Sequence, residues 1–403
     1  MKETKNVPQL RFSGFDDEWE EKKLGECFKE RTQRSAIGEL ISVTISSGVK
    51  KASELERHDS SSEDKSNYKC VYKGDIAYNS MRMWQGASGV SNFDGILSPA
   101  YTVCIPDDNT DSVFFSYMFK IPKIVHTFEI NSQGLTKDTW NLKFPAFSLI
   151  SINATTLAEQ QKIGTFLSHV DSLIQAKTKK LESLKAVKKS LLQKCFPKAG
   201  EKVPEMRFAE FSGDWEEKKL GEIATKVIDK NFDLSVQEVF TNSAEFGVIS
   251  QRDFFDHDIA NTANIDGYYV IQNEDFVYNP RISVTAPVGP INRNNLGRKG
   301  IMSPLYTIFR TKNINTLYLE WYFKTDCWHD FMYLNGDSGA RFDRFSIKDI
   351  VFFEMPILFP ASVAEQQKIG EFFLKYDSLI SAQQKEIDKL KDIKKSLLQK
   401  MFI

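Results

Sequence analysis

One long stretch of sequence occurs twice in this chain, and it constrains the fold more than any other feature. The motif A-E-Q-Q-K-I-G begins at Ala158 and again at Ala364, and the motif K-K-S-L-L-Q-K begins at Lys188 and again at Lys394. The two copies therefore have the same length, with no residue gained or lost between them. An exposed linker does not keep such a register, whereas a helix that must pack at fixed positions does.

The apolar residues of each copy follow one another at spacings of three and four, which is the period of a coiled-coil seam. The predicted helix-pair seam consists of Ile163, Leu167, Val170, Ile174, Leu181, Leu184 and Leu191 in the first copy, and Ile369, Phe373, Tyr376, Ile380, Ile387, Leu390 and Leu397 in the second. A helix of about 38 residues spans roughly 57 Å. Because an isolated helix would expose its apolar stripe, we expect the two copies to pack as an antiparallel pair of long spacer helices. A second apolar line on each helix predicts a further partner surface.

A second repeated element stands at the head of each half. The pattern P-x-[LM]-R-F, followed by a Trp and by E-E-K-K-L-G-E, occurs over residues 7–26 and 203–222. The chain is therefore a tandem duplication of a globular domain followed by a helix. The predicted segments are a first globular domain (1–157), a spacer helix (158–196), a linker (197–202), a second globular domain (203–362) and a second spacer helix (363–403).

Composition places the chain among soluble globular proteins. Its 403 residues are 41% hydrophobic and 27% charged, which predicts two to three domains with ample core. No run of 18 apolar residues occurs, and the polar start predicts neither a signal peptide nor a membrane partner. The 5 cysteines are scattered without a C-x-x-C pair, which indicates a reducing cytoplasm and no zinc framework. The net charge of −1 requires any DNA contact to be made by local patches.

Inside the globular parts a skeleton of strands is kept while the loops differ. D-I-A-Y-N at 75–79 corresponds to D-F-V-Y-N at 275–279, and an S-P-x-Y segment follows in each half. Helical patterns cover about 111–129 and 316–334. We therefore expect an α/β (α+β) fold with two duplicated mixed domains in a pseudo-twofold arrangement. A kept scaffold with divergent polar loops predicts one kind of task carried out on two different targets.

The polar loops at matching positions are the candidate DNA-binding surfaces. Taken singly, each loop is explained as a solvated turn, but Arg pairs with guanine edges and Asn or Gln with adenine edges in a major groove. The candidates in the first domain are Tyr78, Asn79, Ser80, Arg82, Trp84, Gln85, Gln133 and Lys137. The candidates in the second are Tyr278, Asn279, Arg281, Arg293, Asn294, Arg298, Ser338, Arg341 and Arg344.

Signals for catalysis are absent from the sequence. No G-x-x-x-x-G-K-[ST] motif occurs, so no ATP motor is expected. Tyr278-Asn279-Pro280-Arg281 resembles the N-P-P-[YF] site of adenine methyltransferases but lacks the second proline and the aromatic residue. No metal-ligand spacing is complete. We therefore predict a chain that is not an enzyme by itself and holds no cofactor or metal.

Together these motifs resemble the DNA-specificity (S) subunit of type I restriction–modification systems. The resemblance is carried by A-E-Q-Q-K-I-G, K-K-S-L-L-Q-K, the P-x-[LM]-R-F start and the two strand motifs, over essentially the whole chain. It implies that each domain reads one half of a bipartite site in double-stranded DNA. It also implies that the helices set the spacing and dock two methyltransferase (modification) subunits. S-adenosylmethionine, ATP and Mg would then belong to those subunits and to the restriction (translocase) subunits.

Two other interpretations remain open at this point. A coiled-coil scaffold whose duplicated domains bind protein or RNA would show the same repeats. A self-contained methyltransferase is disfavoured by the missing motifs, and it predicts that the isolated chain binds S-adenosylmethionine.

Overall fold

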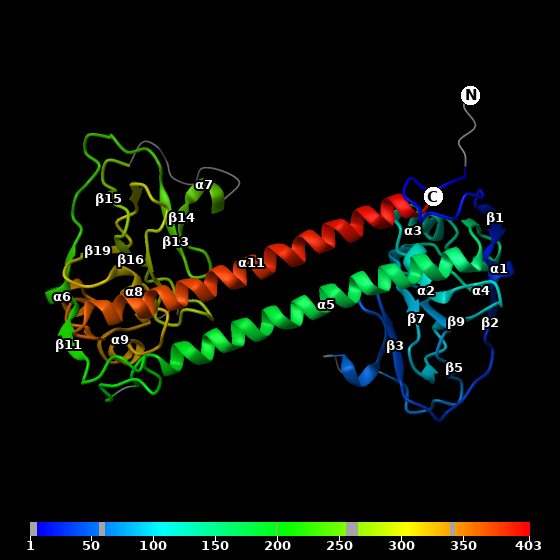
Figure 1. Cartoon of the computed structure of the whole chain (residues 1–403), viewed down its shortest axis with the longest axis horizontal. Helices are drawn as coiled ribbons and strands as arrows, with labels where there is room; N and C mark the ends of the chain where they lie inside the picture. The colour runs from blue at the N-terminus through cyan, green and yellow to red at the C-terminus, as the bar shows by residue number, and fades with distance from the viewer. Residues whose placement is uncertain (1–5, 56–60, 199, 255–264, 339–342) are drawn as a thin grey trace. The chain divides into compact units, whose positions relative to one another are not determined.

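The structure, a computed structural model, describes residues 6–55, 61–198, 200–254, 265–338 and 343–403. The chain forms two compact units. Unit 1 comprises Met1–Lys179 together with Gln384–Ile403, and unit 2 comprises Lys180–Gln383. In Figure 1, unit 1 therefore combines the blue and cyan elements near the start of the chain with the last, red turns.

The globular part of unit 1 contains short strands and short helices, and it leads into the long helix α5. Its elements are β1 (Glu20–Lys23), α1 (Leu24–Cys27), β2 (Phe28–Glu30), β3 (Ile41–Thr44), β4 (Gly48–Lys51), η1 (Ala52–Glu54), β5 (Lys69–Val71), β6 (Ile76–Asn79), η2 (Met83–Gln85), β7 (Ser88–Val90), β8 (Gly95–Leu97), β9 (Tyr101–Pro106), α2 (Ser112–Met118), α3 (Pro122–Ile130), α4 (Phe144–Ser148), β10 (Ser151–Ala154) and α5 (Leu157–Lys194).

The globular part of unit 2 repeats this order and leads into the long helix α11. Its elements are β11 (Glu216–Lys219), α6 (Leu220–Ile223), β12 (Ala224–Lys226), β13 (Phe240–Ser243), β14 (Gly247–Ser250), α7 (Gln251–Phe254), β15 (Tyr269–Ile271), β16 (Phe276–Tyr278), β17 (Ile291–Arg293), β18 (Gly300–Met302), β19 (Thr307–Thr311), α8 (Thr316–Tyr322), α9 (His329–Asn335), α10 (Asp349–Phe352), β20 (Pro356–Phe359) and α11 (Val363–Met401).

The two units share one sheet topology. The 4-stranded antiparallel sheet has the order β2-β9-β6-β7 in unit 1 and β12-β19-β16-β17 in unit 2. Three 2-stranded pairs also match one to one: β1-β10, β3-β4 and β5-β8 with β11-β20, β13-β14 and β15-β18. Even the register is kept, because Tyr78 lies opposite Thr102 and Tyr278 opposite Thr307. This correspondence confirms the predicted duplication of a mixed fold.

Each unit contains the first part of one long helix and the last part of the other. In unit 1 the two segments run antiparallel, joined by the ion pairs Asp171–Lys394 at 2.6 Å and Lys177–Glu386 at 2.7 Å. Because the copies have identical spacing, unit 2 repeats the first of these pairs between Lys188 of α5 and Asp377 of α11.

The predicted seam residues are buried or half-buried. Those buried are Ile163, Leu167, Leu181, Ile369, Phe373 and Ile387. Those half-buried are Val170, Ile174, Leu184, Leu191, Tyr376, Ile380, Leu390 and Leu397.

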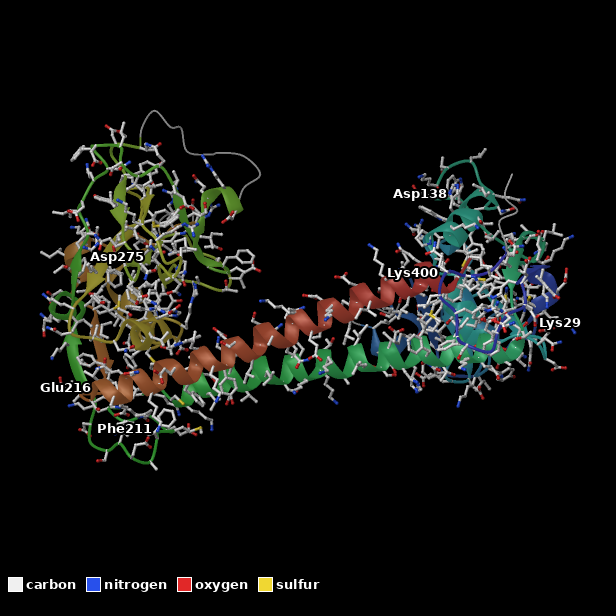
Figure 2. All side chains as sticks on the ribbon, turned by 45° about the horizontal axis from the view of Figure 1, so that its top comes forward. Lys29, Asp138, Phe211, Glu216, Asp275 and Lys400 are labelled. Atoms are coloured by element: carbon white, nitrogen blue, oxygen red, sulfur yellow. The ribbon has the colours of Figure 1, made fainter. Side chains whose placement is uncertain are left out.

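The end of each long helix completes the core of the unit that the other long helix leaves. Phe402, just after α11, is buried in unit 1, where its ring stacks on Phe114 with centroids 5.1 Å apart. Phe196, just after α5, is buried in unit 2 beside Tyr318 at 5.6 Å. Lys400, labelled in Figure 2, accepts a hydrogen bond at its backbone carbonyl from the Leu10 amide at 2.9 Å. The globular part of unit 1 thus depends on the last residues of the chain.

Buried polar contacts explain why the A-E-Q-Q motif is repeated. The Glu159 carboxylate accepts two hydrogen bonds from the Arg11 guanidinium, at 2.7 and 2.8 Å, and Glu365 repeats both contacts with Arg207 at the same distances. These glutamates are almost inaccessible to solvent, so a paired and hydrogen-bonded arginine is required. The next glutamine accepts a backbone hydrogen bond in each unit at 2.9 Å. The motif therefore locks each long helix to its globular part.

The helices predicted at about 111–129 and 316–334 are each divided in two, so this detail of the prediction was wrong. In unit 1 the break lies at Pro122, which has no amide hydrogen and begins α3. In unit 2 the backbone turns after α8, where the Thr325 amide donates to the Tyr322 carbonyl at 3.0 Å, and side chains add further hydrogen bonds. The Thr325 hydroxyl donates to the Tyr322 carbonyl at 2.6 Å, and the Trp328 indole donates to the Phe323 carbonyl at 3.3 Å.

Candidate nucleic-acid interface

The loop that follows β6 holds several of the predicted residues of unit 1. The Asn79 side-chain oxygen accepts a hydrogen bond from the Met81 amide at 3.0 Å, and the Arg82 amide donates to the Asn79 carbonyl at 2.9 Å. Such an Asn-led turn fixes the backbone without a helix or a strand. The turn brings Asn79 and Arg82 to the rim of one hollow.

That hollow, the large cavity of unit 1, has a volume of about 1040 Å³. It lies between the β3–β4 hairpin and the segments that follow β6 and precede β9. Its wall is mostly polar, and the side chains that can donate or accept hydrogen bonds are Glu39, Ser42, Ser53, Ser61, Ser62, Asp64, Asn67, Tyr68, Asn79, Arg82, Ser98 and Tyr101. Concave surfaces with convergent polar groups are the usual place for a ligand. The structure therefore brings together two predicted residues and several that the sequence did not indicate.

A smaller hollow, here called the Ser80 cavity, adjoins the large one. Its volume is about 380 Å³, and Met81, Pro99 and Ala100 line both cavities. Ser80 is buried, and its hydroxyl lies 2.8 Å from the Thr102 hydroxyl. Ser80 thus lines a recess and does not project into open solvent.

A projecting loop carries the other predicted residues of unit 1. Figure 2 shows Asp138 at the outer end of this loop. The rings of Trp84 and Trp140 meet edge to face at 5.5 Å, and the Lys137 ammonium lies within 5.8 Å of both ring centroids. Gln133 pairs with Asn141 through backbone hydrogen bonds, and the Gln133 side chain is exposed, as is that of Gln85.

Two predicted DNA contacts, Tyr78 and Tyr278, are wrong. Both tyrosines lie on the central strands β6 and β16 with relative exposures of 0% and 2%. Tyr78 packs on Phe147 at 5.1 Å, and burial raises the pKa of its phenol. The Tyr278 hydroxyl donates to the Val288 carbonyl at 2.9 Å. Both side chains belong to the core because β6 and β16 are covered on both faces: the neighbours Ala77 and Val277 are buried in a second cluster.

In unit 2 the structure places Arg281 beside Arg344. The two residues form an isolated antiparallel bridge, and both side chains are exposed. Within the described parts of the chain, neither guanidinium is paired with a carboxylate. Asn279 fixes the start of this segment, since its side-chain oxygen accepts from the Arg281 amide at 3.0 Å and its amide group donates to the Asn242 carbonyl at 2.7 Å. Ser338, which precedes Arg344 in the sequence, is half-buried. Arg341 lies outside the described residues.

The predicted loop around residue 294 has a structural role. Asn294 is 0% exposed and donates to the carbonyl groups of Gln272 and Arg298 at 2.8 and 3.0 Å, so the prediction that it contacts DNA is wrong. The Arg293 side chain is only 11% exposed and is paired with Glu274 and Glu320, so the prediction that Arg293 contacts DNA is also wrong. Arg298 is half exposed, but its guanidinium forms two hydrogen bonds with Glu238.

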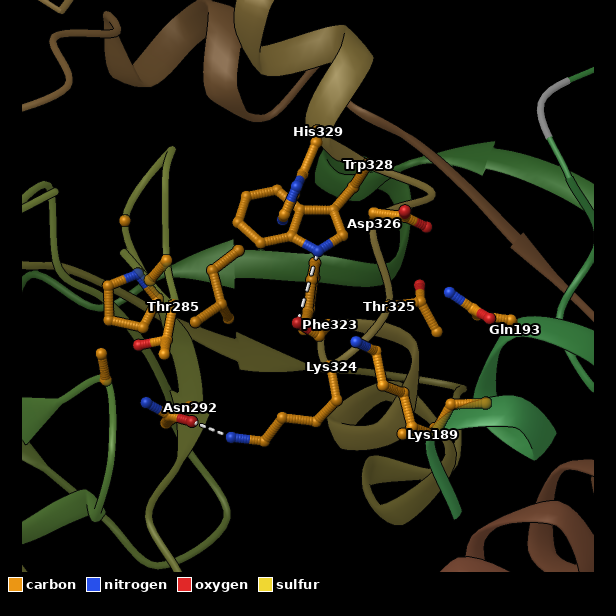
Figure 3. Close-up of a pocket in the computed structure, with 16 residues that line it drawn as sticks. Lys189, Gln193, Thr285, Asn292, Phe323, Lys324, Thr325, Asp326, Trp328 and His329 are labelled. Carbon is orange, nitrogen blue, oxygen red and sulfur yellow. Dashed lines mark hydrogen bonds between the residues drawn. The ribbon is translucent and has the colours of Figure 1, made fainter. Parts of the chain in front are cut away.

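A lysine that sequence reasoning missed lies behind the candidate loop in each unit. Lys120 donates to the carbonyl groups of Gly86 and Ile45, and burial lowers the pKa of its ammonium to about 8. In unit 2 Lys324 donates to the Asn292 side chain at the edge of a cavity of about 260 Å³, as Figure 3 shows. The available signal was the dipeptide Phe-Lys, which recurs at 119–120 and 323–324.

The cavity in Figure 3 is lined by groups of mixed character. Lys189 and Gln193 come from α5, while Thr325, Trp328 and His329 come from the segment between α8 and α9 and the first residue of α9. Among the described residues no group of three or more His, Cys, Asp or Glu side chains is arranged to hold a metal ion. No helix in the described ranges is both long and apolar enough to cross a membrane.

Part of the chain matches the model of a known protein family. Residues 16–186 match the type I restriction modification DNA specificity domain. A type I restriction enzyme specificity subunit of Methanocaldococcus jannaschii is 27% identical over 265 residues, which are 62% of this chain and 57% of that protein. The match thus spans less than two thirds of the length of this relative.

Solved structures show the same fold at low sequence identity. The S subunit of the type I restriction-modification system from M. genitalium matches with a TM-score of 0.55 and 14% identity, over 98% of this chain and 99% of that one. A chain from a structural study of the assembly and conformational transition of the type I R-M system matches with a TM-score of 0.53 and 16% identity, over 95% and 97% of the two chains.

Proposed function

We infer that this chain, whose residues 16–186 match the type I restriction modification DNA specificity domain, is a sequence-specific DNA-binding subunit. Each unit reads one half of a bipartite site in double-stranded DNA. The observation that carries this proposal is the contrast between a shared scaffold and divergent loops. The two units have the same sheet order, yet the segment after Asn79 reads Ser-Met-Arg and the segment after Asn279 reads Pro-Arg-Ile.

The exposed loop residues suit the chemistry of base recognition. Arg281 and Arg344 present two guanidinium groups on adjacent segments, neither of them paired with a carboxylate among the described residues, and an arginine forms two hydrogen bonds with a guanine edge in the major groove. In unit 1, Asn79 and Arg82 line the large cavity together. Contacts to phosphates position such a domain, and contacts to base edges give it specificity.

Repeated apolar surfaces support the docking of two copies of one partner. A groove of about 210 Å³ in unit 2 is lined by Phe208 and Phe372, and a groove of about 340 Å³ in unit 1 is lined by their counterparts Phe12 and Phe166. On the long helices, Leu173, Val187, Leu379 and Ile393 remain 42–48% exposed. Equivalent apolar patches in both units fit two identical partner proteins.

We propose that these partners are the methyltransferase (modification) subunits, with restriction (translocase) subunits completing the complex. Binding of S-adenosylmethionine, ATP and Mg then resides in those subunits, and this chain takes no part in catalysis. The complex works on DNA in the cytoplasm, and the length of the long helices sets the gap between the two half-sites.

Substitution of the paired arginines in unit 2 tests the reading of bases. Arg281→Ala or Arg344→Ala should weaken binding of one half-site by about 1–3 kcal/mol and leave the other half-site unchanged. Lys312→Ala removes a positive charge elsewhere on unit 2 and serves as the control. The measurement is a binding titration of the assembled complex on duplexes mutated in either half. Unchanged binding for both arginine variants would show that these loops do not read DNA.

A further inference from the structure

We propose that the Ser80 cavity of unit 1 binds a single nucleotide rotated out of the DNA duplex. This inference rests on the proposed function and adds a ligand to one of the two recognition domains. The cavity of about 380 Å³ falls in the size range of small-molecule sites, about 300–1,000 Å³. A stacked base pair cannot enter a recess of this size, because its neighbours in the helix would have to enter with it. A single extrahelical base can.

The polar groups of the cavity match the hydrogen-bonding edge of a base. The Ser80 and Thr102 hydroxyl groups are hydrogen-bonded to each other, and Thr102 also interacts with the Tyr78 hydroxyl, which leaves oxygen lone pairs for a ligand. The Asn141 side-chain oxygen is buried and, within the described residues, has no hydrogen-bond donor. An unpaired buried acceptor is unfavourable, and an exocyclic amino group of adenine or cytosine would supply the missing donor.

The remaining walls match the faces and the phosphate of a nucleotide. Met81, Pro99, Phe144 and Pro145 supply apolar surface on which a planar base can stack. Lys143 also lines the cavity, is exposed, and has no carboxylate partner among the described residues. Its ammonium group is available to a DNA phosphate.

The second lysine that lines this cavity, Lys69, already has a carboxylate partner. Lys69, on the same wall, is paired with Glu30 at 3.1 Å, and both side chains are largely buried. This pair adds no net charge, so Lys143 alone gives the cavity its positive character. One cation with apolar walls and a short polar edge fits one nucleotide better than a run of phosphates.

Unit 2 carries different side chains at the positions that match this cavity, which provides an internal control. Pro280 stands where unit 1 has Ser80, and Leu305 stands where unit 1 has Ala100. The counterpart of Thr102 is Thr307, whose hydroxyl donates to Asp349 at 3.2 Å. We therefore expect an extrahelical nucleotide in the half-site of unit 1 and none in that of unit 2.

Ala100→Leu is the decisive variant because it introduces the residue that unit 2 carries at the same position. Ala100 is exposed and lines the cavity, so the larger side chain occupies the site without entering the core. The matched control is Leu305→Ala. The probe is a duplex containing the mapped target, with 2-aminopurine placed in turn at each position of both half-sites. The protein is the full chain assembled with methyltransferase subunits.

In the unaltered complex, 2-aminopurine fluorescence should rise at one position of the unit 1 half-site other than the methylated adenine. Ala100→Leu should abolish this rise and weaken binding on the order of tenfold, the loss expected for one base contact. Leu305→Ala should change neither. A rise only at the methylated adenine, or a rise that persists in Ala100→Leu, would overturn the inference. Loss of site-specific binding by the unaltered complex would instead contradict the proposed function. If Ala100→Leu weakens partner assembly but leaves the DNA signal intact, the cavity binds a protein side chain, and the inference also fails.

Discussion

Replacement of Phe402 by alanine should destabilise unit 1, although Phe402 ends the helix that leaves the globular part of unit 2. The ring is 6% exposed, stacks on Phe114 at 5.1 Å and meets Trp19 edge to face at 6.2 Å. Replacing a buried Phe by Ala lowers the free energy of unfolding by about 3–5 kcal/mol. The backbone near a chain end can relax around the lost ring, so we expect a value near the lower limit, about 3 kcal/mol. For a unit of this size the midpoint of thermal unfolding should fall by about 6–12 °C.

Hydrogen exchange read by mass spectrometry on the assembled complex separates the two units. In Phe402→Ala, amide protection should fall in β6 and β9 of unit 1 and stay unchanged in β16 and β19 of unit 2. Phe196→Ala is the matched control and should give the opposite pattern, since Phe196 is buried beside Tyr318 in unit 2. Loss of protection in unit 2 for Phe402→Ala would refute the exchange of helix ends between the units.

Three further results are expected. A chain ending at Lys202 should dimerise with partner subunits present and read a symmetric site. In the full chain Asp171 pairs with Lys394, and in the dimer it can pair with Lys188 of the other copy, which occupies the matching position. A monomer by light scattering would contradict this. Four residues inserted within 176–180 lengthen α5 by about 6 Å and should widen the gap in the DNA site by one or two base pairs, with the half-site bases unchanged in methylation mapping. Burial lowers the pKa of Lys120 from 10.5 in the unfolded chain to about 8 in the folded one. Between pH 8 and 10.5 the unfolded state therefore binds more protons, and the free energy of unfolding of unit 1 should rise with pH. Chemical denaturation at several pH values should show this rise, and Lys120→Met should lack it.

Local sequence patterns were sufficient to predict the duplication, the long helices and the strands that recur in both halves. Each of these features repeats within the chain, so the periodicity of one copy supports that of the other. The division of the predicted helix at 111–129 follows from Pro122, whose effect was underestimated. The exchange of helix ends was not predictable, because an apolar residue such as Phe402 does not indicate which of two similar cores it enters.

The candidate site was predicted only at the level of loops. Asn79 and Arg281 do lie on accessible segments, because an Asn-led turn follows each central strand. Arg293 was misassigned because its partners Glu274 and Glu320 are distant in sequence, and only the fold brings them together. Lys120 was missed for a similar reason, since its burial depends on the loop that follows β6.

Mapping of methylated adenines in cells that carry this chain with its methyltransferase tests the central claim most directly. The account predicts a bipartite motif with a gap of fixed length. It also predicts that Arg281→Ala alters the bases of one half of the motif and leaves the other half and the gap as they were. A continuous motif, or a change in both halves caused by this one substitution, would contradict the assignment of one half-site to each unit.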